Sequence, residues 1–310
     1  NLDYGRLDSN NPYSMFVNNP SCQGKYELEG APLKDESCAA NESCTFNMFS
    51  KEDEAFLLNS DFGALINQNI SLKRKLNNLS IKINNFEEFC FTKSLMGIDF
   101  TKFDKKIIEN KLCYISRYDY FKHHYSTVLE YLKKYTDTET IAELGSGYGL
   151  VLFVFKFLGL KNMLEGYEMD EYGIKIAKEV NDFFHLDIKF DEIEDLRENS
   201  KFKNNFEGKT VFTHYVLHNI KNNFSKSIDN ILNLKPKQVL HFEPIYEKHP
   251  NDLKGITCKT YLKSVNYQIK ILSTIKEFKN EGKLKNLKIQ NIGIGGQPFD
   301  KLFLIRYTPT

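Results

Sequence analysis

Residues 140–149 read Thr-Ile-Ala-Glu-Leu-Gly-Ser-Gly-Tyr-Gly, a short apolar run that leads into three alternating glycines. The run has the length of a buried strand, and residues 150–160 after it are apolar enough for a helix that packs beneath a sheet. Alternating glycines allow a sharp turn and let a ligand lie directly on main-chain N–H groups. The stretch therefore predicts a strand, a ligand-binding turn and a helix in succession.

The next acidic position narrows the choice of ligand. The glycine turn alone could cradle a pyrophosphate or the amino-acid end of a nucleoside. Residues 162–170, Asn-Met-Leu-Glu-Gly-Tyr-Glu-Met-Asp, predict a second strand that ends in Glu168 or Asp170. A carboxylate at the end of the second strand can accept hydrogen bonds from both hydroxyls of a ribose.

Together, Glu-Leu-Gly-Ser-Gly-Tyr-Gly and the strand ending Gly-Tyr-Glu-Met-Asp resemble the class I S-adenosylmethionine-dependent methyltransferases. The dinucleotide fingerprint G-x-G-x-x-G fits less well, because Leu150 stands where it has its third glycine. Two alternatives to the methyltransferase resemblance are a site for another nucleotide and a glycine turn that only packs a helix on a sheet. The resemblance implies S-adenosyl-L-methionine as cofactor. The residues expected to bind it are Glu143, Gly145, Ser146, Gly147, Tyr148, Gly149, Glu168, Met169, Asp191, Ile193 and His214.

From Thr140 onward the pattern alternates between strand and helix, which predicts a doubly wound α/β fold with a mainly parallel sheet. The last two strands flank residues 293–298 and resemble the antiparallel hairpin that ends the methyltransferase sheet, which gives seven strands. The expected strands are 140–144, 163–168, 187–190, 210–215, 238–243, 286–293 and 301–307. The expected helices are 149–159, 171–183, about 222–232 and 260–281.

The chain before the glycine turn predicts a separate, mostly helical region. Residues 1–50 lack periodicity, whereas residues 51–95 and 101–135 have helical spacing. We therefore expect an acceptor-binding or lid region over 1–135 and a cofactor domain over 136–310. An aromatic stripe on a helix is more often core than ligand platform. The residues expected to contact the substrate are nevertheless Tyr118, Arg117, His124, Tyr125, His241 and Tyr246.

Residues that directly follow the strands are the candidates for chemistry, because ligands of open α/β sheets bind beyond the carboxyl ends of the strands. After the third strand, Asp191 or Ile193 could contact an adenine, or the acidic stretch could be a solvated helix start. The fourth strand is followed by His218, whose neutral imidazole suits a general base near neutral pH.

The catalytic candidates are His218, Glu243 and His214. Glu243, which ends the fifth strand, is expected to point toward the acceptor. It could orient His218, bind an acceptor amine, ligate a metal with His241 or His214, or only cap a turn. His214 and His218 are four residues apart, but a bare histidine pair is not a complete metal site, so no metal is expected.

Composition excludes several classes of partner. The net charge of +1 over 310 residues predicts neither nucleic-acid nor membrane binding. The longest apolar run, residues 150–160, is interrupted by Lys156 and is too short to span a bilayer. The first residues lack the order of a signal peptide, and the six cysteines form no CxxC pair, which indicates free thiols and a cytoplasmic protein.

These observations predict an enzyme that methylates an O or N atom of a small molecule, sugar or natural-product intermediate in a biosynthetic reaction. The C-terminal half also resembles bacterial sugar O-methyltransferases at His241-Phe242-Glu243-Pro244, at residues 282–290 and at Leu304-Ile305-Arg306-Tyr307. A peptide-modifying methyltransferase and a catalytically silent cofactor-binding scaffold are the alternatives. A small-molecule or peptide substrate is expected, and a homodimer is conceivable.

Overall fold

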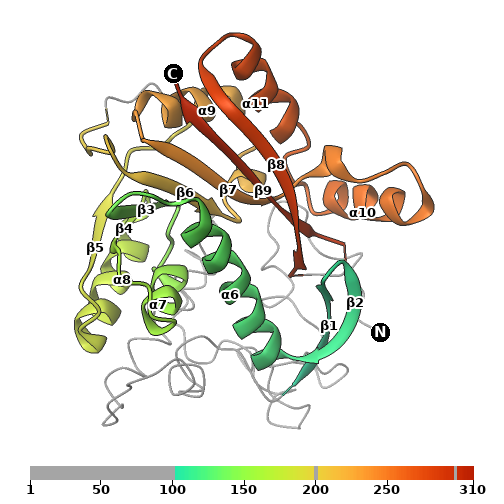
Figure 1. Cartoon of the computed structure of the whole chain (residues 1–310), viewed down its shortest axis with the longest axis horizontal. Coiled ribbons are helices and arrows are strands. Elements are labelled where there is room, and N and C mark those ends of the chain that lie inside the picture. The colour runs from blue at the N-terminus through green and yellow to red at the C-terminus, as the bar shows by residue number, and fades with distance from the viewer. Residues whose placement is uncertain (1–101, 199–201, 297–298) are drawn as a thin grey trace, which may run out of the picture.

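The computed structural model describes residues 102–198, 202–296 and 299–310 (Figure 1). The helical spacing expected over 51–95, the irregular segment 1–50 and four of the cysteines lie outside these residues. Within them, Cys113 and Cys258 are free thiols.

Nine strands form one mixed sheet in the order β2-β1-β8-β9-β7-β6-β3-β4-β5. The middle of the sheet is parallel, from β7 through β6, β3 and β4 to β5, and β9 and β8 continue it as an antiparallel pair. The bounds are β1 Phe103–Ile108, β2 Lys111–Ser116, β3 Thr140–Leu144, β4 Met163–Glu168, β5 Ile188–Glu192, β6 Thr210–His214, β7 Gln238–Pro244, β8 Leu284–Gly295 and β9 Lys301–Pro309.

Helices cover both faces of this sheet (Figure 1). The helices α6 (Arg117–Tyr135), α7 (Leu150–Phe157) and α8 (Glu171–Phe184) pack on one face, and α9 (Phe224–Asn233) and α11 (Ile271–Asn280) pack on the other. Successive residues of one strand serve opposite faces, as Val211 and Phe212 of β6 do, because side chains alternate along a strand. Such alternation between two apolar layers explains why the parallel strands read as continuous apolar runs.

The doubly wound α/β fold is confirmed over the described residues, with five parallel strands and a closing antiparallel pair. The expected number of seven strands is too low, because β1 and β2 extend the sheet beyond β8.

The helix expected from residue 101 begins only at Arg117, and residues 103–116 form a hairpin instead. Its turn residues, Glu109 and Asn110, both have positive φ, at 48° and 64°. A two-residue turn with this geometry matches the twist of paired strands. Ile107, which is 1% exposed, anchors the hairpin to the core.

The helix expected over 260–281 is two helices, α10 (Leu253–Ser264) and α11. They are separated at Asn266, which adopts a left-handed φ of 57°. The described residues also include two short 3-10 turns, η3 (Leu217–Asn219) after β6 and η4 (Tyr246–Lys248) after β7.

Candidate functional site

The glycine turn joins β3 to α7 at the carboxyl end of the parallel strands. The N–H groups of Gly145 and Ser146 donate to the carbonyl oxygen of Tyr167 in β4 at 2.8 and 3.1 Å, which fixes the turn to the neighbouring strand. Gly147 has a φ of 53°, a conformation that side chains disfavour. Tyr148 and Gly149 complete the turn, and Gly149 is the residue that precedes α7.

Glu168, the last residue of β4, bonds directly to this turn. One carboxylate oxygen accepts from the Gly147 N–H at 2.9 Å, and the other accepts from the N–H groups of Met169 and Asp170 at 2.9 and 3.2 Å. Burial raises the pKa of Glu168 despite these three hydrogen bonds. The side chain of Asp170 instead caps α8, so Glu168 is the acid that faces the turn.

Two buried polar atoms beside the turn lack partners among the described residues. They are Oε2 of Glu143 and Oγ of Ser146, whose residues are 1% and 7% exposed. Burial, and then the nearby Glu168, raise the pKa of Glu143 well above its usual value. Native proteins seldom leave such atoms unpaired, so each requires a partner such as an ordered water or a polar ligand.

The segment after β5 contributes less. Asp191 is half-exposed and lies 3.7 Å from the ammonium of Lys189. Ile193 is buried and donates its N–H to the carbonyl oxygen of Glu168 at 3.0 Å. No helix starts here, so the acidic stretch is not a helix N-terminus.

Glu243 is fully buried at the end of β7 and organises the segment that follows β6. Its Oε1 accepts from Thr213 Oγ1 and from the N–H groups of Val216 and Leu217 at 2.8–2.9 Å. Its Oε2 accepts from the N–H and Nδ1 of His218 at 3.3 and 3.0 Å. Burial alone would raise the pKa of Glu243, but these hydrogen bonds, led by that of His218, hold it below its usual value.

The expected proximity of His218 and Glu243 is therefore confirmed, whereas an orientation toward the acceptor stays a prediction for Glu243. Its oxygens are occupied by the chain around it. In the neutral form of His218, the ionised carboxylate makes Nδ1 the protonated nitrogen, which leaves a lone pair on Nε2. No described residue bonds to that nitrogen.

His214, at the end of β6, contacts α6 rather than the glycine turn. Its Nε2 lies 2.9 Å from Nε2 of His124, whose Nδ1 lies 3.0 Å from the hydroxyl of Tyr120. Burial, and then the neighbouring His218, lower the pKa of His214 to about 3. Burial likewise lowers the pKa of His124. Both imidazoles are neutral at physiological pH.

The other expected substrate residues are scattered. His241 is 0% exposed, and its ring nitrogens bond to Thr213 and Tyr307 at 2.9 Å each, so it is a structural residue of the sheet interior. Tyr125 packs in the core against Phe121. Arg117 pairs with Asp104, Tyr118 packs at the edge of the core, and Tyr246 lies in η4 beneath two lysines.

Sequence reasoning missed three tyrosines of this region. The Tyr267 ring lies 4.1 Å from that of His218, and the Tyr215 hydroxyl accepts from the Gly296 N–H at 3.1 Å. Tyr120 precedes His124 by four residues, which places both side chains on one face of a helix. Only this last spacing could have been recognised in the sequence.

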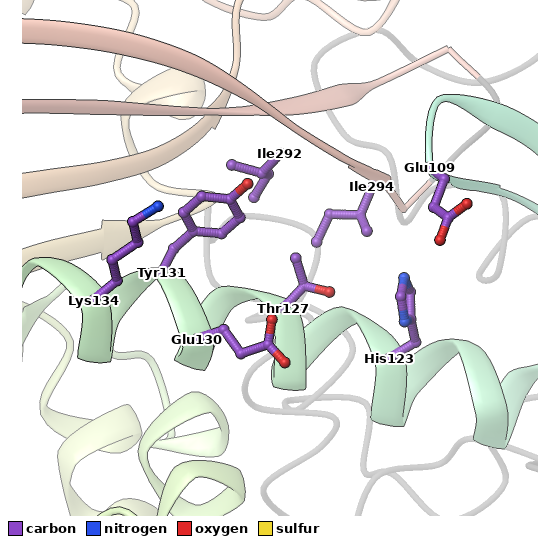
Figure 2. A pocket seen from close by; sticks show the side chains of 8 residues that line it. All are labelled: Glu109, His123, Thr127, Glu130, Tyr131, Lys134, Ile292 and Ile294. Carbon is purple, nitrogen blue, oxygen red and sulfur yellow. The ribbon is translucent and has the colours of Figure 1, made fainter.

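A groove of about 430 Å³ lies elsewhere, between α6 and β8 (Figure 2). His123, Thr127 and Glu130 on α6 face Ile294 on β8 across it. None of the predicted site residues lines it; its lining is Glu109, His123, Thr127, Glu130, Tyr131, Lys134, Ile292 and Ile294. It is therefore distinct from the candidate site.

The described residues contain neither a metal-binding cluster nor a membrane-spanning helix. No cluster of three or more histidine, cysteine or acidic side chains could hold a metal ion. No described helix combines the length and apolar character needed to cross a membrane.

No family model and no curated protein matches the chain. Among solved structures, it is similar to magnesium protoporphyrin IX methyltransferase from Synechocystis PCC 6803, with 11% identity, a TM-score of 0.46, and coverage of 84% of this chain and 98% of that one. It is also similar to the methyltransferase domain of bacterial CtHen1, with 15% identity, a TM-score of 0.44, and coverage of 61% and 98%. Similarity at these levels carries no argument about function, and the fold rests on the strand order above.

Replacing Glu243 by alanine leaves five donors without their acceptor, three of them backbone N–H groups in a buried segment. We expect Glu243→Ala to lower the free energy of unfolding by about 3 kcal/mol in urea titrations. Because the pKa of Glu243 is below its usual value of 4.5, its contribution is lost as pH falls through the folded-state pKa. Glu198→Ala, at an exposed carboxylate, serves as control. Equal destabilisation by both variants would contradict this role.

Glu143 predicts the opposite dependence on pH. Its raised pKa means that the folded protein loses stability as pH rises above the usual value of 4.5, until the folded-state pKa is passed. We expect Glu143→Gln, which cannot ionise, to melt at a higher temperature than the unmodified protein, by a margin that widens from about pH 5 to about pH 8. A constant or shrinking margin in scanning calorimetry would show that Glu143 ionises freely.

Proposed function

We propose that this protein transfers a methyl group from S-adenosyl-L-methionine to an O or N atom of a small molecule, sugar or natural-product intermediate. The observation that carries the proposal is the bond between Glu168 and the Gly147 N–H, which joins the acid that ends β4 to the glycine turn. A ribose-binding carboxylate is thus held at the ligand-binding turn, at the carboxyl edge of a doubly wound sheet.

The residues at the turn fit this cofactor. Glu143 and Ser146 offer buried, unpartnered oxygen atoms to its polar amino-acid end. Glu168 has used three of its acceptor positions on backbone N–H groups, and a carboxylate has about four, so a ribose hydroxyl can be added. We expect Asp191 and Ile193, at the end of β5, to contact the adenine. When bound, the cofactor supplies an electrophilic methyl group on a sulfonium.

The chain's own contribution to the reaction is a base and its orientation. Glu243 holds His218 through Nδ1, so Nε2 can take the proton from the acceptor hydroxyl or amine as the new bond to carbon forms. Glu243 acts through His218 as a positioning residue. The pairing also confines the imidazole to one ring orientation, which keeps the base aligned with the acceptor.

We further propose that the region up to residue 135 builds the acceptor side, since α6 brings Tyr120 and His124 next to His214. A peptide acceptor is the nearest alternative substrate. The alternative that is not an enzyme is a catalytically silent cofactor-binding scaffold. The oriented Nε2 of His218, which has no partner among the described residues, argues against it. Incubation with radiolabelled S-adenosylmethionine and fractionated cell extract distinguishes the three.

Cofactor binding is expected to depend on Gly147 and Glu168. Gly147→Val places a branched side chain on the ligand-binding turn at a left-handed φ, and we expect no measurable binding of S-adenosylhomocysteine by calorimetry. Glu168→Ala is expected to weaken binding by about 1–3 kcal/mol, the scale of a lost charge-assisted hydrogen bond.

Gly159→Val is the matched control for backbone strain. Gly159 has a φ of 83°, yet a β-carbon there meets no atom within 4 Å. This variant therefore carries the strain without the obstruction, and we expect it to bind normally. Unchanged affinity in folded Gly147→Val and Glu168→Ala would refute the cofactor assignment.

The base assignment has its own test. We expect His218→Ala to lower turnover by about 10²–10⁴, the usual contribution of a positioned general base, with little change in cofactor affinity. The assay uses the extract fraction that accepts label. His185→Asn, at an exposed imidazole, is the control. Unchanged turnover in His218→Ala would leave positioning alone as the source of the rate.

A further inference from the structure

A chain of hydrogen-bonding groups that the base mechanism does not use runs from α6 to the end of β6. The Tyr120 hydroxyl lies 3.0 Å from Nδ1 of His124, and Nε2 of His124 lies 2.9 Å from Nε2 of His214. Tyr120 and His124 are 9% and 5% exposed, so water contributes little to either group. The three side chains therefore satisfy one another.

Two ring nitrogens at hydrogen-bond distance must share one proton, because two N–H groups or two lone pairs would repel. Both imidazoles are neutral at physiological pH, since burial depresses their pKa values. Each ring then carries one proton. The proton between them belongs either to His124 or to His214, and the choice decides which nitrogen of His214 remains protonated.

Tyr120 decides this choice. Its hydroxyl stays protonated, because burial raises the pKa of the phenol above its usual value. If the hydroxyl accepted from His124, its own proton would need another acceptor, and no other described residue bonds to it. A buried donor without an acceptor is costly. Tyr120 therefore donates to Nδ1 of His124, which leaves the proton of His124 on Nε2.

We propose that Tyr120 and His124 are positioning residues that fix His214 as the Nδ1–H tautomer, so that His214 offers a hydrogen-bond donor to the methyl acceptor. His124 donates from Nε2 to Nε2 of His214, and the single proton of His214 is then on Nδ1. No described residue bonds to that nitrogen. The identity of the ligand rests on the proposed function, whereas the tautomer of His214 does not depend on it.

The two histidines after β6 consequently have opposite polarity. Glu243 leaves a lone pair on Nε2 of His218, and the relay from Tyr120 leaves a proton on Nδ1 of His214. The ring of Tyr215 lies between them in the sequence and contacts both, with centroids at 4.9 Å from His214 and 5.6 Å from His218. This pairing selects acceptors that carry an oxygen lone pair in addition to the O–H or N–H that is methylated, such as polyhydroxylated or carbonyl-bearing molecules.

Nitrogen-15 NMR of the full chain labelled in histidine tests the tautomers without any acceptor. Long-range proton–nitrogen correlations distinguish protonated from bare ring nitrogens, and His124→Gln and His214→Gln assign the signals. We expect His214 to be protonated on Nδ1 and His124 on Nε2 near neutral pH. A His214 protonated on Nε2 would overturn the proposal.

Tyr120→Phe removes the donor and keeps the ring. We expect the ratio of the two His214 tautomers to shift by about fivefold toward Nε2–H, the effect of one lost hydrogen bond. Tyr135→Phe is the matched control, since its hydroxyl leaves the same helix toward Gln290, and we expect no shift. An unchanged ratio in folded Tyr120→Phe would overturn the role of Tyr120; if that variant does not fold, the unmodified protein still decides the tautomer.

Calorimetry with S-adenosylhomocysteine on the same samples separates this inference from the proposed function. Absence of binding together with the Nδ1–H tautomer would reject the function and keep the relay. Normal binding together with the Nε2–H tautomer would reject the relay and keep the function. Normal binding by Tyr120→Phe, with its tautomer ratio shifted, is the result expected if both hold.

Discussion

The buried carboxylate of Glu243 is the constraint on which the candidate site depends. An ionised group removed from water is tolerated only when hydrogen bonds replace its hydration, and here residues 213–218 supply five. To deliver these donors, the chain must leave β6 abruptly, and Tyr215 adopts a φ of 56° at that point. The same turn sets the orientation of His218, so the hydrogen bonds that Glu243 requires also fix the position of the proposed base.

The three acids at the mouth of the sheet show how donors tune identical side chains. Glu243 has five donors, and its pKa falls below the usual value. Glu168 has three backbone donors, which do not outweigh burial, so its pKa rises. Glu143 has an oxygen without any partner beside a second acid, and its pKa rises furthest above the usual range. Glu143 and Glu168, the two acids of the proposed cofactor site, are thus the ones least stabilised as anions. Pairing with a polar cofactor would therefore be favourable for them.

Sequence patterns predicted the fold where they reflect burial and failed where they depend on long-range pairing. The strands β3, β4 and β6 match their expected starts because apolar runs between turn signals are specific to a buried parallel sheet. The hairpin of β1 and β2 was read as helix, because its aromatic and charged residues fit either period and its stability depends on pairing with β8.

On β7, alternation indicated that His241 and Glu243 share a face, but not which one. Both turn toward the Thr213 hydroxyl, at 2.9 Å each. Only the pairing of β6 with β7 could reveal this. The contact between His124 and His214 could not be predicted from the sequence either, since 90 residues separate them.

The glycine turn and the segment that follows β6 are in direct contact. A β-carbon on Gly145 would lie 2.8 Å from a methyl carbon of Val216, so packing of the chain requires a glycine at this position. Val216 is also the residue whose N–H is held by Glu243 at 2.8 Å. Glu243 therefore holds the segment after β6 next to the glycine turn, and the N–H of Gly147 in that turn donates to Glu168. A continuous series of short contacts thus links Glu168, the glycine turn, residue 216 and Glu243, so the two parts of the candidate site are not independent loops.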